Sequence, residues 1–99
     1  MPNSPNGFRL LRGPEAAELT QKIADYTGRE VADALLDTWP NGEIRVQLRE
    51  NVRGANVFIV QTFKESVNDR LWELLVMIDA ARRASAAQIT AVIPYFPYG

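Results

Sequence analysis

The sequence of 99 residues contains no cysteine and no histidine. Without cysteine the chain can form no disulfide bond and no thiolate metal site. Without histidine it lacks the side chain that most often acts as a base or metal ligand near neutral pH. Any chemistry that this chain performs must therefore use carboxylates, lysine, arginine or backbone groups.

An excess of either charge is also lacking. The chain has 11 Lys and Arg residues against 12 Asp and Glu residues, which leaves a formal net charge of −1. This balance excludes an extended basic surface, so we expect neither a nucleic acid nor an anionic membrane as a partner. The glycine-rich phosphate loops, nucleophile motifs and metal-spaced clusters that mark many enzymes are missing from the sequence too.

Long apolar runs are absent as well. The richest apolar stretch, residues 71–81, contains Glu73 and Asp79 and is too short to span a bilayer. Residues 1–7 are polar and turn-forming, without the basic start and apolar core of a secretory signal. We therefore expect a flexible N-terminus over residues 1–7 and a cytoplasmic protein. With 46% hydrophobic residues, the remaining residues 8–99 fit one compact domain.

A first helix is predicted to start at Pro14, which suits the first helical position because it has no N–H group to leave unpaired. Leu19, Ile23 and Tyr26 recur at intervals of three and four residues, which predicts one buried stripe. Gly28 is expected to end this helix.

Short apolar segments predict the strands of a sheet. Residues 8–11 and 31–36 are the first two segments of this kind. Residues 43–49 alternate apolar and polar side chains, which is typical of a strand with one exposed face. The continuous apolar run at residues 57–60 indicates a strand buried on both faces, and residues 89–93 indicate a further parallel strand.

A second, longer helix is predicted from Ser66 to about Ser85. Ser66 and Asp69 have the spacing of a capping box. Apolar residues lie on most of the circumference of this helix, so we expect it to be heavily buried and to contact more than its own sheet. Arg82 and Arg83 are interpreted as compensating the negative end of the helix, the alternative being a phosphate-binding patch.

The order of these elements predicts an α/β domain with a mostly parallel sheet flanked by helices. In such sheets ligands bind beyond the carboxyl ends of the strands. Residues 94–99 leave the last strand as an aromatic loop that contains two prolines. Tyr95, Phe96 and Tyr98 could stack on bases there, but we favour the interpretation that they brace the loop.

Three segments carry a more specific pattern. They are residues 39–43 (Trp-Pro-Asn-Gly-Glu), residues 50–54 (Glu-Asn-Val-Arg-Gly), and residues 68–98, which run from Asn-Asp-x-Leu-x-Glu-Leu-Leu through Arg-Arg-Ala-Ser-Ala to Pro-Tyr-Phe-Pro-Tyr. In order and spacing they resemble the N-terminal domain of the ribose-phosphate diphosphokinases, from about Leu10 to Gly99. The resemblance implies the phosphoribosyltransferase-like α/β fold, with this chain as most of the first of two similar domains, incomplete at its carboxyl end.

The resemblance also implies an activity. Enzymes of this family transfer the diphosphoryl group of ATP to ribose 5-phosphate, giving phosphoribosyl diphosphate and AMP for nucleotide biosynthesis, with Mg²⁺ neutralising the phosphates. It places the reacting groups and the Mg²⁺ ligands outside this segment. We therefore expect no catalytic and no metal-binding residue among these 99, and no activity from this chain alone.

Two other functions stay open. The chain could be a non-catalytic regulatory or nucleotide-sensing subunit that assembles with true synthetases, or a generic doubly wound domain that binds small molecules.

Residues 39–43 match a family loop that reaches the ATP site of a neighbouring subunit, so the resemblance implies that Trp39, Asn41 and Glu43 bind adenine. The chemistry fits, because an aromatic face can stack on a purine while the amide and the carboxylate bond to its edge. Trp39 replaces the more usual Phe and Pro40 the usual Ser. The alternative is an ordinary Pro-Asn-Gly turn with Trp39 anchored in the core.

The resemblance further implies an allosteric site for inorganic phosphate or ADP. Arg53 is the expected phosphate ligand, since a guanidinium offers a bidentate fork and Gly54 lets the backbone approach closely. Asn51, where many members carry Ser, and Ser85 match positions near that site. The alternative is that residues 51–54 are an ordinary turn that joins two strands.

Members of the family are homo-oligomers in which dimers assemble into hexamers, and we expect the same here.

Overall fold

The computed structural model describes residues 7–94, and its centre is a sheet of three parallel strands. The strand order is β1 (Phe8–Arg12), β4 (Asn56–Val60) and β5 (Gln88–Val92). Arg12 is in register with Val60, and Val60 with Val92, so the three strands end at one carboxyl edge. The predicted strands at residues 57–60 and 89–93 are confirmed.

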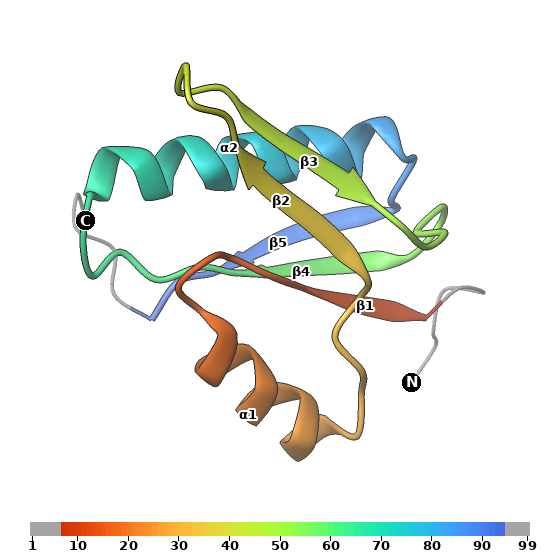
Figure 1. Cartoon of the computed structure of the whole chain (residues 1–99). Helices are drawn as coiled ribbons and strands as arrows, with labels where there is room; N and C mark the ends of the chain where they lie inside the picture. The colour runs from red at the N-terminus through yellow and green to blue at the C-terminus, as the bar shows by residue number, and fades with distance from the viewer. Residues whose placement is uncertain (1–6, 95–99) are drawn as a thin grey trace.

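Two helices and a separate hairpin complete the fold. The hairpin pairs β2 (Ala34–Thr38) with β3 (Ile44–Leu48) in antiparallel fashion, and the helices are α1 (Ala17–Thr27) and α2 (Val67–Arg83). Helix α1 lies on one face of the parallel sheet, while α2 and the hairpin lie on the other (Figure 1). The predicted α/β class with a parallel sheet and flanking helices is confirmed.

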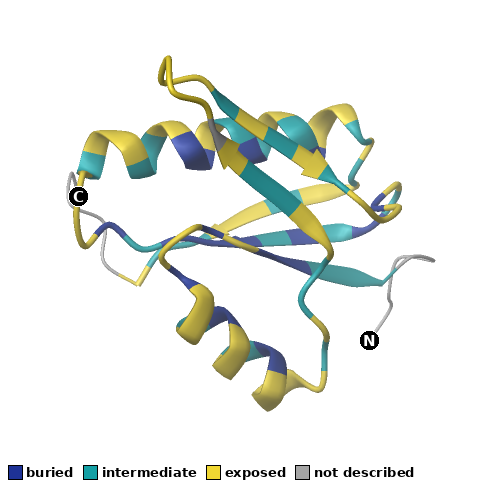
Figure 2. Ribbon diagram, in the orientation of Figure 1, coloured by how far each residue is buried: buried dark blue, intermediate teal, exposed yellow. Residues whose placement is uncertain are grey.

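Two apolar cores lie on the two faces of the sheet. Val57 and Ile59 of β4 belong to the core under α2 and the hairpin, whereas Val60 belongs to the core under α1. All three side chains are fully buried. Figure 2 shows this burial along β1 and β4 and on the sides of the helices that face them. None of the helices within residues 7–94 is long and apolar enough to cross a membrane.

The second predicted strand was placed three residues too early. Residues 34–38 form β2, while Val31 makes an isolated parallel bridge to Leu10 before the chain crosses to the hairpin. In β3 the predicted alternation is confirmed, since Ile44, Val46 and Leu48 are half-buried and the two residues between them are exposed.

Helix α1 differs from its prediction at both its start and its buried face. It begins at Ala17 rather than Pro14, because residues 13–16 form a turn in which Ala16 N donates to Gly13 O at 3.0 Å. Tyr26 was predicted to be buried and is 93% exposed. The other two predicted residues, Leu19 and Ile23, are partly buried and pack against the core under α1. The fully buried residues of the helix are Thr20 and Ala24, which are small enough for close packing. The hydroxyl of Thr20 donates to Ala16 O at 2.6 Å, which satisfies this buried polar group.

The predicted capping box of α2 is wrong. Ser66 is the residue before the helix, but it is in the left-handed region, with φ of 52°, and its side chain makes no capping bond. A capping side chain acts from an extended backbone, which Ser66 does not have. The helix ends at Arg83 rather than Ser85, and Arg83 Nε lies 2.8 Å from Asp79 Oδ2.

Helix α2 is less buried than predicted. Leu74, Met77 and Ala81 face the core, but Trp72 is 62% exposed and Leu75 is 47% exposed. The expected contact beyond its own sheet is confirmed, because α2 also packs on β3 of the hairpin. The apolar outer face of α2 is therefore exposed in the isolated chain.

Gly13 offers a test of the packing at the carboxyl edge. A Cβ atom at this buried position would lie 2.9 Å from Val60 O and would overlap the side-chain amide of Gln61. We expect Gly13→Ala to lower the free energy of unfolding by about 1–3 kcal/mol, as overpacking does in a close-packed interior. Urea unfolding measures this change. Gly28→Asn is the control: no atom lies within 4 Å of its Cβ, and asparagine tolerates the φ of 72° there, so its stability should stay close to wild type.

Candidate functional site

The two predicted binding loops lie at opposite ends of the hairpin. Residues 39–43 join β2 to β3 at the tip, and residues 49–55 follow β3 at the base (Figure 1). Five extended residues at about 3.3 Å each place the ends of β3 roughly 17 Å apart. One hairpin thus carries two separate loops.

The loop at the tip is a closed turn. Trp39 N donates to Glu43 O at 2.7 Å, and Gly42 N donates to Trp39 O at 2.8 Å. Gly42 has a φ of 89°, which favours glycine. Trp39 is 45% exposed, so the alternative that it anchors the core is wrong, while the expected turn is present.

Asn41 and Glu43 hold each other in this turn. Asn41 Oδ1 accepts from Glu43 N at 3.0 Å, and Asn41 Nδ2 donates to Glu43 Oε1 at 3.1 Å. Both side chains are exposed. The turn therefore presents an amide and a carboxylate in a fixed relation, next to an exposed indole, and these groups can meet the face and the edge of a purine.

The loop at the base is also ordered by its own side chains. Asn51 Oδ1 accepts from Arg53 N at 3.0 Å, in the manner of an Asx turn, and Ala55 N donates to Val52 O at 3.0 Å. Val52 is buried and fixes the loop to the core, whereas Asn51 and Arg53 are exposed. Gly54 has a φ of 74°.

The third predicted effector residue is brought to the same corner. Ser85 O accepts from Gly54 N at 2.9 Å, so the turn after α2 lies directly against the loop at the base of the hairpin. Ser85 is exposed and has a φ of 67°. The structure therefore brings Ser85 together with Asn51 and Arg53, and it keeps all three apart from Trp39.

Glu50 fixes the start of this loop and was not singled out in the sequence. Its Oε2 lies 3.0 Å from Arg9 Nε, and its Oε1 accepts from Asp33 N at 2.6 Å. One carboxylate thus ties the base of the hairpin to β1 and to the segment before β2. A single glutamate beside a glycine-containing turn gives no local signal of contacts so distant in sequence.

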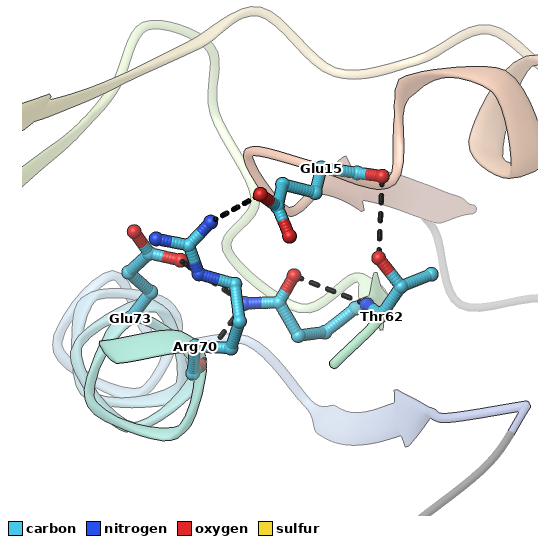
Figure 3. A network of polar contacts seen from close by, with 5 residues as sticks. Glu15, Thr62, Arg70 and Glu73 are labelled. Carbon is cyan, nitrogen blue, oxygen red and sulfur yellow. Dashed lines mark hydrogen bonds and ion pairs between the residues drawn. The ribbon is translucent and has the colours of Figure 1, made fainter. Parts of the chain in front are cut away.

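A third polar cluster lies at the carboxyl edge of the sheet (Figure 3). Arg70 on α2 reaches both Glu73, with Nε 2.8 Å from Oε1, and Glu15, with Nη1 3.1 Å from Oε2. Gln61 Nε2 donates to Arg70 O at 3.0 Å and to Glu73 Oε1 at 3.4 Å. We refer to Glu15, Gln61, Thr62, Arg70 and Glu73 as the edge network. The sequence did not predict this network, because it shows Glu73 only as a charged residue within an apolar stretch.

Glu73 is a buried carboxyl within this network. Its burial raises the pKa of the carboxyl above the ordinary value of 4.5, since burial penalises the charged form. The positive charge of Arg70 and the hydrogen bond from Gln61 oppose this rise in pKa, and the negative charges of Glu15 and Asp69 add to it. The net direction is upward, so the folded chain holds this proton more tightly than a free glutamate does.

A resident metal ion does not fit the part of the chain that the structure describes. Within residues 7–94 no group of three or more His, Cys, Asp or Glu residues could hold one. The aromatic residues Tyr95, Phe96 and Tyr98, for which bracing was preferred to base stacking, lie outside the described residues.

Comparison with known proteins gives one consistent match. Residues 8–99 match the family model described as the N-terminal domain of ribose phosphate pyrophosphokinase. A ribose-phosphate pyrophosphokinase of Aquifex aeolicus is 43% identical over 94 residues, which cover 95% of this chain and 30% of that protein. One of Vibrio vulnificus is 52% identical over 91 residues, which cover 92% of this chain and 29% of that protein.

A solved structure agrees with these relatives. The crystal structure of phosphoribosylpyrophosphate synthetase from Mycobacterium smegmatis superposes with a TM-score of 0.88 at 37% identity, over 92% of this chain and 30% of that one. The chain thus spans about 30% of the length of the proteins that it matches.

The raised pKa of Glu73 predicts a pH-dependent stability. Because the folded chain binds this proton more tightly than the unfolded chain, protonation stabilises the fold. This stabilisation is fully present below pH 4.5 and is lost as the pH rises through the higher pKa of the folded state. Glu73→Gln abolishes this titration, so its melting temperature should rise relative to that of the wild type as the pH increases over this window. Scanning calorimetry at several pH values measures the difference.

The matched control for this measurement is Glu18→Gln, which alters an exposed carboxylate of α1. Because this variant leaves the buried carboxyl of Glu73 in place, it should not show the pH-dependent rise in melting temperature that is expected for Glu73→Gln. A difference between Glu73→Gln and the wild type that stays constant with pH would contradict the assignment of a raised pKa to Glu73.

Proposed function

The chain belongs to the family of ribose phosphate pyrophosphokinase N-terminal domains, and on that premise we propose the activity in which it takes part. It forms part of an enzyme that transfers the diphosphoryl group of ATP to ribose 5-phosphate, giving phosphoribosyl diphosphate and AMP for nucleotide biosynthesis. The identity of 43–52% to enzymes with this name, across more than nine tenths of the chain, supports this proposal.

The observation that carries the proposal is the loop at the hairpin tip. An exposed indole beside a hydrogen-bonded amide and carboxylate suits a purine that carries an exocyclic amino group. Trp39 stacks on the adenine of ATP, while Asn41 and Glu43 bond to its edge. Because their mutual bonds fix them before the ligand arrives, little side-chain freedom is lost on binding.

The loop at the base of the hairpin is proposed to bind an effector. Arg53 bonds to the phosphates of ADP or to inorganic phosphate. The hydroxyl group of Ser85 and the side-chain amide of Asn51 complete the site. The bond from Gly54 N to Ser85 O supports this proposal, because it holds two segments distant in sequence at one corner.

In this proposal the chain binds ATP and the effector, and it does not supply the groups that react in diphosphoryl transfer. It has no histidine or cysteine, and its described residues 7–94 hold no cluster suited to a metal ion. We propose that Mg²⁺ acts as the counter-ion of the ATP phosphates and is held by groups outside this segment, and that the 99 residues alone form no phosphoribosyl diphosphate.

The proposal includes a cytoplasmic homo-oligomer in which the adenine loop serves the ATP site of a neighbouring subunit. The exposed apolar face of α2 at Trp72 and Leu75 supports self-association, because monomeric proteins seldom leave large apolar side chains together at the surface. Assembly of dimers into a hexamer follows the family.

Trp39→Ala tests the adenine site. Loss of a stacking partner costs about 1–3 kcal/mol per base, so the KM for ATP of the intact enzyme should rise roughly ten-fold or more. Trp39→Phe should restore most of the affinity, since it keeps an aromatic face. Steady-state assays of phosphoribosyl diphosphate formation measure both variants.

The control for this assay is Tyr26→Ala on α1, which removes an aromatic side chain that is 93% exposed and lies outside both proposed sites. Its KM for ATP should match the wild type. An unchanged KM in Trp39→Ala would overturn the adenine assignment, and an intact wild-type protein without synthetase activity would favour the regulatory subunit instead.

Ser85→Gly tests the effector site. Glycine adopts the φ of 67° without strain, so the turn should persist and the fold should stay within about 1 kcal/mol of wild type. Loss of the hydroxyl removes a hydrogen bond to a charged phosphate, so half-inhibition of the intact enzyme should need roughly ten-fold more ADP. Ser66→Gly replaces the other left-handed serine, at the opposite end of α2, and should leave inhibition unchanged. Equal inhibition of the wild type and Ser85→Gly would remove Ser85 from the site.

A further inference from the structure

Val60 and Gln61, at the end of β4, together join the ends of all three parallel strands. The backbone N–H group of Gln61 donates to Val92 O at 3.1 Å, at the end of β5, and Val60 O accepts from Gly13 N at 2.8 Å, directly after β1. Gly13 has no Cβ atom, which leaves room for the side chain of Gln61. The side chain is fully buried, and its Oε1 accepts from Thr62 N at 3.2 Å. Gln61 therefore fixes the carboxyl edge of the sheet.

The edge network connects this edge to both helices. Gln61 Nε2 donates to Arg70 O in the first turns of α2, and Arg70 in turn reaches Glu15 in the turn that precedes α1. Thr62 Oγ1 donates to Glu15 O at 3.2 Å, which closes the network into a ring (Figure 3). The directions in which the two helices leave the edge are thus tied to the strand ends.

Stability alone does not account for this network. The side chain of Glu73 is 5% exposed and that of Arg70 is 14% exposed, so both charges have lost most of their hydration. Apolar side chains of similar volume in place of a buried ion pair are often neutral or stabilising, because the penalty of desolvation cancels the attraction. The buried Nε of Arg70 has no hydrogen-bond partner among the residues that the structure describes, although it lies 2.8 Å from Glu73 Oε1. What Arg70 offers over apolar packing is its reach to Glu15, which links α2 to the turn before α1.

One residue of the edge network, Thr62, also lines a pocket. A pocket of about 350 Å³ opens beside the carboxyl edge and is lined by Thr62, Phe63, Lys64 and Pro94. Thr62 belongs to both the pocket and the network, since its N–H and hydroxyl groups are held by Gln61 and Glu15. The edge of an open α/β sheet where the strands end is the place where ligands bind.

We propose that Gln61, Arg70 and Glu73 are positioning residues, which set the carboxyl edge of the sheet and the Thr62 wall of its pocket for the transfer step. They touch no substrate themselves. They act by fixing Thr62, the last residues of β5 and the starts of both helices in one arrangement. The inference rests on the proposed function for the reaction that it serves, while the arrangement itself can be tested without that reaction.

The test replaces the ion pair by apolar side chains of similar volume, Arg70→Met with Glu73→Leu, in the intact enzyme. We expect a melting temperature equal to or above wild type. The kcat should fall by about 10-fold to 100-fold, because small displacements of positioned groups are costly for catalysis. The KM for ATP should stay within about two-fold, since neither exchanged side chain belongs to the adenine loop. A merely structural role predicts wild-type kcat in a variant this stable, and that result would overturn the proposal.

Amide hydrogen exchange in the same preparations tests the arrangement without any assay of activity. The amides of Gln61 and Gly13 should exchange roughly ten-fold faster in the double variant, because their bonds join the strand ends. Asn56 N, which donates to Gly7 O at 3.0 Å at the opposite edge, should keep its wild-type exchange. Unchanged exchange at Gln61 and Gly13 would overturn the proposal. An inactive wild-type protein would instead count against the proposed function and leave this measurement to decide the positioning role.

If the double variant does not fold, the single variant Arg70→Lys tests the positioning role. Lysine keeps the charge but lacks the planar fork that reaches Glu15 and Glu73 together. Its kcat should fall in the same direction at an unchanged KM for ATP, and a wild-type kcat would again contradict the proposal. The control is Glu18→Ala with Lys22→Ala, an exposed pair on α1 at 4.0 Å, for which kcat and exchange should both match the wild type.

Discussion

The rest of the structure depends on the burial of β4 on both faces. This strand pairs with β1 on one side and β5 on the other, and its alternate side chains complete both cores. No polar side chain can be accommodated along such a strand without a partner. The first polar group after it, Gln61, is therefore bonded through both its backbone and its side chain. The polar network at the carboxyl edge follows from the apolar strand that precedes it.

Much of this fold could be predicted from the sequence, because burial imposes a strong local period. The apolar run at residues 57–60 and the alternation at residues 43–49 predict the strands observed as β4 and β3. Periodicity indicates that a helix has an apolar stripe, but it does not decide which residues reach the neighbouring element. Tyr26 and Trp72 were therefore assigned to buried faces and are exposed. The spacing of Ser66 to Asp69 predicts a cap, yet capping depends on the backbone angles of Ser66, which the spacing does not encode.

Features of the candidate sites could be predicted where the residues that form them are adjacent in sequence, and not where they are distant. The turn at residues 39–43 could be predicted because the residues that form it are adjacent, and its Asn41–Glu43 pair closes locally. The proximity of Ser85 to Gly54 was available only from the family resemblance, since a helix and a strand separate the two. The edge network was missed. Its members come from the turn before α1, the segment after β4 and the first turns of α2. A single glutamate in an apolar helix carries no sign of a partner twelve residues earlier.

The length of helix α2 fixes both the distance and the rotation between two parts of the molecule. Its 17 residues, at about 1.5 Å each, span roughly 25 Å from the edge network at its start to the Ser85 turn after its end. One inserted residue would lengthen this span by only about 1.5 Å, but it would also rotate everything beyond it by about 100°. The carbonyl of Ser85 would then point away from Gly54. Substitutions on the outer face of this helix leave its length and rotation unchanged, whereas insertions and deletions within it alter both. The length of α2 is thus a stricter requirement of this domain than the identity of most residues on its surface.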